Sequence, residues 1–168
     1  PGNDFRIADD FTISNPAGWT ITTIDFLDYQ TNAPTTSSPI SGMNVRIWQG
    51  QPGVAGSVVV FGDTTTNRLT TSVFSGTYRT GTTCDLKRGL FTSTVSINIS
   101  LPPGTYWIDW QVIGSGSYSG PWSPVVTING MRSKPGANAI QWNSQVQTWG
   151  PIVDNGVALL ERWRAGEW

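Results

Sequence analysis

The segment VSINISLPPGTYWIDWQV, residues 95–112, alternates apolar with polar side chains on both sides of a turn sequence. A period of two places successive side chains on opposite faces of a β-strand, so each half predicts a strand with one buried face. The apolar positions are Val95, Ile97, Ile99 and Leu101 in the first half, and Tyr106, Ile108, Trp110 and Val112 in the second. Between the halves, Pro102-Pro103-Gly104 predicts a tight turn between antiparallel neighbours.

Further strand-like runs occur along the whole chain, separated by turn residues. We expect them at residues 5–13, 19–30, 43–48, 57–61, 70–79, 124–128, 139–142, 145–149 and 157–163. A change of phase near Thr22-Thr23 predicts either a β-bulge or burial of the strand on both faces. The continuous apolar run at 57–61 predicts a central strand. No repeat, heptad or linker divides residues 1–168, which favours a single domain. The pattern is typical of an all-β fold, an antiparallel, jelly-roll-like β-sandwich of about ten strands.

Charged residues are scarce, at 12% of the chain, and the net charge is −1. With Lys87 and Lys134 as the only lysines, the chain offers no cationic stripe for phosphate groups, which argues against nucleic acid as a partner. No stretch approaches the ~20 apolar residues of a membrane span, so we expect no membrane insertion. The chain begins at Pro1 without methionine, and hydroxyl and amide side chains replace ionic ones. We interpret it as a processed, exported protein, located extracellularly or on the cell surface.

The chain contains no histidine, which excludes His-based triads and imidazole metal sites. A carboxylate pair is the remaining route to hydrolysis, because glycosidases use two carboxyl groups about 5–10 Å apart. The candidate carboxylates are Asp9, Asp10, Asp25, Asp28, Asp63, Asp109 and Asp154. Asp109 is the most suggestive, because tryptophans flank it closely, but we favour a structural role in which it accepts hydrogen bonds from backbone or from an arginine such as Arg46. We therefore predict no catalytic residues and a protein that is not an enzyme.

Metal, cofactor and disulfide signals are weak. Oxygen ligands for calcium are available at Asp9-Asp10 and around Asp63, but neither segment has the ligand spacing of a known loop. A turn in which Asp63 accepts hydrogen bonds from its own backbone is the simpler interpretation. We predict no metal site and no cofactor. Cys84 is the only cysteine, so it is either a buried thiol or an intermolecular link.

The nine tryptophans divide by their phase along the strands. Trp19 and Trp110 are in phase with apolar neighbours and are expected in the core. Trp48 and Trp107 fall on the opposite phase, where we expect a solvated face. Together with Trp122 and the carboxylate of Asp109, they could form a platform on which sugar rings stack, as in a carbohydrate-binding module.

Four ordered blocks resemble a family of uncharacterised exported bacterial β-sandwich domains, found in surface or secreted proteins of environmental bacteria. The blocks are VRIWQGQPG from Val45, VVVFGDTTTNRL from Val58, LPPGTYWIDWQ from Leu101 and SGPWSPVVTI from Ser119. The resemblance covers residues 9–149 and implies fold and location more than chemistry. Residues 82–88 and the tail LERWRAGEW, residues 160–168, depart from the family pattern.

These observations favour a non-enzymatic structural subunit that assembles with copies of itself into a filament or cell-surface matrix. Low charge suits close packing, because few ions must lose their water when surfaces meet. We expect the contacts to come from terminal strands and apolar faces, with residues 157–168 as an assembly or docking tail. The residues expected at these contacts are Phe5, Phe11, Leu160, Trp163 and Trp168. The alternative is the carbohydrate-binding module, whose partner would be a polysaccharide.

Overall fold

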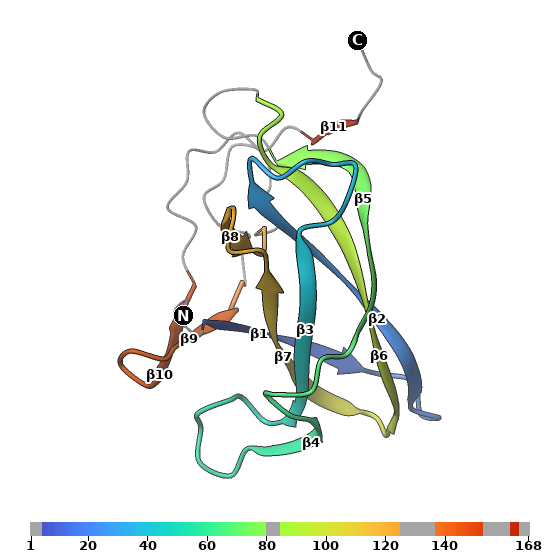
Figure 1. Cartoon of the computed structure of the whole chain (residues 1–168). Helices are drawn as coiled ribbons and strands as arrows, with labels where there is room; N and C mark the ends of the chain where they lie inside the picture. The colour runs from blue at the N-terminus through green and yellow to red at the C-terminus, as the bar shows by residue number, and fades with distance from the viewer. Residues whose placement is uncertain (1–4, 80–84, 125–136, 153–161, 165–168) are drawn as a thin grey trace.

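The computed structural model describes residues 5–79, 85–124, 137–152 and 162–164. These residues form two antiparallel β-sheets packed face to face, with no helix in the described ranges (Figure 1). The six-stranded sheet has the order β10 (Thr148–Pro151), β9 (Ile140–Asn143), β1 (Arg6–Ile13), β7 (Gly104–Gly114), β3 (Ile40–Gln49) and β4 (Val58–Gly62). The five-stranded sheet has the order β11 (Arg162–Arg164), β5 (Leu69–Arg79), β6 (Gly89–Leu101), β2 (Trp19–Thr31) and β8 (Ser119–Trp122). The predicted antiparallel β-sandwich is confirmed.

The core lies between the sheets and is built by the period-two pattern of the strands. On β3, Met43, Val45 and Ile47 are all fully buried and face the partner sheet. From β6, Val95 and Ile97 enter the same cluster. Fully burying a side chain of this size contributes roughly 1.5–3 kcal/mol, so these alternating positions are the main source of stability.

The turn predicted at Pro102-Pro103-Gly104 does not join neighbouring strands of one sheet. It carries the chain from β6 in the five-stranded sheet to β7 in the six-stranded sheet. Prolines lack the N–H that a sheet ladder needs, so β6 ends here and the chain crosses the end of the sandwich. The hydroxyl of Tyr106 donates a hydrogen bond to the carbonyl of Pro102 at 3.1 Å and holds the crossing in place.

The bulge, the two core tryptophans and the central strand that the sequence predicts have different outcomes in the structure. The bulge is confirmed, because the pairing of β2 with β6 shifts register between Ile21 and Thr23. Trp110 packs against the core as predicted, but Trp19 is 45% exposed, because it begins β2 at the end of the sandwich. The run 57–61 forms an edge strand and not a central one, since among the described residues β4 pairs with β3 alone.

Most of the strand expected at 124–128 and most of the strand expected at 157–163 lie outside the described residues. The described ranges contain no helix with the length and hydropathy of a membrane span.

Candidate functional site

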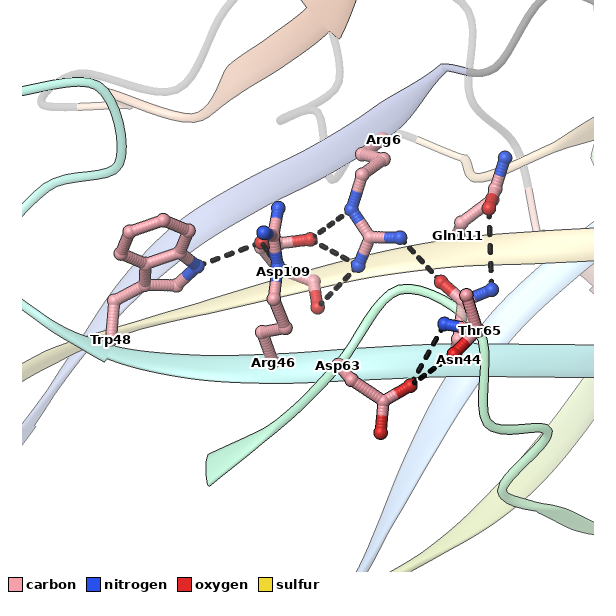
Figure 2. Close-up of polar contacts among 8 residues, drawn as sticks. All are labelled: Arg6, Asn44, Arg46, Trp48, Asp63, Thr65, Asp109 and Gln111. Carbon is pink, nitrogen blue, oxygen red and sulfur yellow. Dashed lines mark hydrogen bonds and ion pairs between the residues drawn. The ribbon is translucent and has the colours of Figure 1, made fainter. Parts of the chain in front are cut away.

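Three of the four residues predicted for the sugar-binding platform, Trp48, Trp107 and Asp109, lie together on the outer face of the six-stranded sheet, the face turned away from the core. In the pairing of β3 with β7, Trp48 is opposite Trp107 and Arg46 is opposite Asp109. Paired residues in an antiparallel ladder project from the same face, so all four side chains meet there. Figure 2 shows Asp109 between Trp48, Arg46 and Arg6, with Asn44 and Gln111 beyond.

Asp109 is fully buried, and both of its carboxylate oxygens have hydrogen-bond donors. Its Oδ1 pairs with the guanidinium of Arg6, while its Oδ2 accepts hydrogen bonds from Arg46 Nε and Trp48 Nε1, each at 2.7 Å. The predicted structural role of Asp109, with Arg46 as its donor, is therefore confirmed. Charge-assisted hydrogen bonds of this kind are about twice as strong as neutral ones, and they leave no oxygen turned toward a substrate.

Arg6 is the residue at this site that sequence inspection missed. It is buried on β1, and its guanidinium also donates to Asn44 Oδ1, whose Nδ2 in turn donates to Gln111 Oε1 at 3.3 Å. The network thus connects β1, β3 and β7. The one available signal was that Arg6 is in phase with Ala8, which faces the same side, but nothing local to β1 shows that β7 lies beside it.

The outer face carries a second small apolar cluster and not the solvated face predicted for Trp48 and Trp107. Ala8, Trp107 and Ile140 are buried there, with Trp48 and Trp149 packed against them. Trp107 is only 7% exposed. The expectation of an exposed Trp107 is therefore wrong, because the β9–β10 hairpin extends the sheet beside β1 and brings Ile140 and Trp149 onto this face.

The segment between β3 and β4 also reaches this cluster. Pro52 is fully buried, and a Cβ added to Gly53 would lie 2.8 Å from Trp149 Cδ1. Gly53 has a φ of +84°, which other residues rarely adopt. Both the close approach and the backbone conformation require glycine at this position.

Trp122 does not join the other residues of the predicted platform. It lies on β8 at the edge of the five-stranded sheet, opposite Tyr29, and is half exposed. The structure therefore brings Trp48, Trp107 and Asp109 together but places Trp122 elsewhere.

The carboxylates considered as calcium ligands accept hydrogen bonds from other groups of the chain. Asp63 Oδ1 accepts backbone N–H bonds from Thr65 at 2.8 Å and Thr66 at 2.6 Å, and these bonds hold the pKa of Asp63 well below its usual range. This confirms the predicted self-capped turn. Asp9 Oδ1 accepts from the backbone of Asp10, whose own carboxylate accepts from Asn138. Within the described ranges, no group of three or more His, Cys, Asp or Glu side chains is placed to hold a metal ion.

A second buried carboxyl group, that of Asp28, lies between the two sheets. Neither of its oxygens has a hydrogen-bond partner. Burial raises the pKa of Asp28 to about 7, and the neighbouring Ser93 hydroxyl opposes this rise. Asp28 is thus the candidate carboxylate whose environment departs most from that of a solvated acid.

The residues predicted for assembly are divided between the fold and its surface. Phe11 stacks between Trp19 and Tyr106, at centroid distances of 6.4 and 5.7 Å, so it belongs to the chain's own packing. Phe5 precedes β1 and is exposed. Trp163 lies on β11, whose backbone pairs with β5. Leu160, Trp168 and Cys84 lie outside the described residues.

No family model, no curated protein and no solved structure matches this chain. The resemblance of its four sequence blocks to exported bacterial sandwich domains therefore stays a prediction.

Proposed function

We propose that this protein is a non-enzymatic structural subunit, outside the cell or on its surface, that self-associates through the free edge of β4. The observation that supports this most strongly is the exposure of Val58, Val59 and Val60, at 52%, 42% and 36%. These valines lie on an edge strand, and no strand of the described part of the chain pairs with its outer N–H and C=O groups. Such an edge is a template for pairing with another chain.

A comparison of the sheet edges in the described ranges favours β4. The edges β8 and β10 have four residues each and contain Pro121 and Pro151, which cannot donate to a ladder. The edge β11 has three residues, two of which are arginines. In contrast, β4 has five residues, and residues 49–62 contain no charge and only Pro52, which lies before the strand. Its one protective feature is a bulge, where Val60 is the extra residue between the pairs Ile47–Phe61 and Trp48–Val59.

A second copy of the chain is the partner that suits this edge. Two β4 strands related by a two-fold axis would pair antiparallel, valine against valine, with no like charges opposed. The pairing would join two six-stranded sheets into one continuous sheet. A two-fold contact closes on itself, so a filament needs a second interface. We propose that the exposed Phe5 and the C-terminal residues 157–168 provide it.

Carbohydrate binding is the alternative function. It has less support, because Trp107 is buried, both oxygens of Asp109 are occupied and Trp122 lies in the other sheet.

Sedimentation velocity over a wide concentration range, combined with electron microscopy, tests the proposal. We expect the native chain to associate and Val58→Lys to weaken this association at least tenfold, because a lysine on the edge opposes strand pairing. The matched control is Val146→Lys, since Val146 is 63% exposed in the β9–β10 turn, away from the β4 edge. A native chain that stays monomeric at every concentration would contradict the proposal, as would equal effects of the two substitutions.

A further inference from the structure

Asp28 occupies an interior position of β2, where alternate residues face the opposing sheet. It is in phase with Phe26, a member of the core cluster, and is paired with the buried Phe91 on β6. The next inward residue, Gln30, is fully satisfied, because its amide exchanges hydrogen bonds with the backbone of Ser115 and Tyr118. Asp28 has no such partners, although an isolated buried carboxylate is far more costly to bury than an amide.

The nearest polar side chains form a chain of hydroxyl groups. Ser93 donates to Ser72 Oγ at 2.8 Å, and Ser72 is 2.7 Å from Ser38 Oγ. The Ser93 hydroxyl favours the ionised form of Asp28, but this effect is smaller than that of burial, which favours the neutral form.

No charged group in the described ranges faces Asp28 from the elements around it. Strands β6 and β8 contain no charged residue. On β3 and β7, Arg46 and Asp109 bind each other on the outer face. On β5, Arg79 donates to the hydroxyl of Tyr29, which is on the opposite face of β2.

The remaining charges near this end of β2 are also engaged or solvated. Asp25 is out of phase with Asp28 and accepts from the Thr94 hydroxyl at the exposed surface. Arg88 pairs with Asp85 at 3.4 Å, and Lys87 is exposed.

We infer that Asp28 is a proton-dependent lock in the interior of the sandwich: its neutral form stays buried between the sheets, whereas its ionised form favours separation of the packing around β2. This inference does not depend on the proposed self-association. It describes how the stability of a single chain follows pH.

The direction of the pH dependence follows from the position of the pKa. Burial raises the pKa of Asp28 to about 7 from a value of 3.8, so the folded chain holds this proton more tightly than the unfolded chain does. The contribution to stability is therefore complete below pH 3.8, declines as the pH rises toward 7, and stays constant above it. Asp63 affects the stability of the folded chain over a different pH range, because its lowered pKa changes stability only below pH 3.8.

Urea unfolding of the whole chain between about pH 4.5 and 8.5 tests the inference. We expect the folding equilibrium constant of the native chain to fall by up to about tenfold per pH unit toward pH 7 and then level off. Asp28→Asn should remove this decline, because an amide does not titrate. Asp25→Asn, on the exposed face of the same strand, should retain it.

A carboxyl titration of the native chain by carbon-13 NMR provides a second measurement in case Asp28→Asn does not fold. The carboxyl signal of Asp28 should titrate near neutral pH. The inference is overturned if every aspartate of the folded chain ionises below about pH 5, or if Asp28→Asn and the native chain show the same pH dependence.

Discussion

The outer face of the six-stranded sheet and the interior between the sheets each contain a fully buried aspartate, and the two differ in every contact. Asp109 on the outer face is held by two arginines and a tryptophan N–H. Asp28 in the interior has no partner for either oxygen. Because the same chemical group is buried in both places, the difference shows what its surroundings contribute. An ionised carboxylate stabilises the folded chain only where charged donors replace the water it has lost.

The largest expected effect comes from removing the carboxylate of the outer face. Asp109→Ala leaves the buried guanidinium of Arg6 without its counter-ion, and breaking a buried pair in this way costs about 3–5 kcal/mol. Urea unfolding near neutral pH measures the loss. A loss below about 1 kcal/mol would show that the network is not a source of stability.

A smaller effect is expected from removing one donor of the same network. Trp48→Phe retains the aromatic ring but deletes the N–H that Asp109 Oδ2 accepts at 2.7 Å. A hydrogen bond to a charged group is worth about 1.5–3 kcal/mol, and Arg46 continues to hold the same oxygen, so we expect the lower end of that range. As a control, Trp142→Phe alters a partly buried tryptophan of the same sheet, on β9. Equal losses in the two variants would contradict a role for the Trp48 N–H.

The smallest expected effect is the difference between two glycine substitutions, which tests how the outer face is covered. Gly53→Ala places a Cβ against Trp149 at a φ of +84°, whereas Gly56→Ala has a similar φ of +89° with no atom within 4 Å. Both should lose about 1–2 kcal/mol from backbone strain. Gly53→Ala should lose roughly 1 kcal/mol more from overpacking. Urea unfolding followed by tryptophan fluorescence measures both. No difference between the two would mean that residues 50–53 do not press on the aromatic cluster.

The two regions also differ in how far the sequence predicts them. Phase along a strand is a local property, so the buried faces of β3 and β6 follow from alternation alone. The order of the strands depends on contacts between distant segments. For this reason, the sequence could not predict that β4 lies at an edge or that the chain crosses between the sheets from β6 to β7. It also could not predict that Arg6 pairs with Asp109 or that Trp107 is buried. Asp28 did carry a signal, because it is in phase with Phe26, but a partnerless carboxyl is apparent only when all neighbouring strands are in place.

The most direct test of the contrast between the two aspartates makes the same substitution at both sites and compares the free energies of unfolding at about pH 8, where Asp28 is mostly ionised. Asparagine preserves the shape of the side chain and removes the charge. We predict opposite signs, with Asp109→Asn destabilising the chain because two arginines lose their counter-ion. Asp28→Asn should stabilise it, because the unpaired charge is removed. Loss of stability in both variants, or a gain in both, would contradict the account.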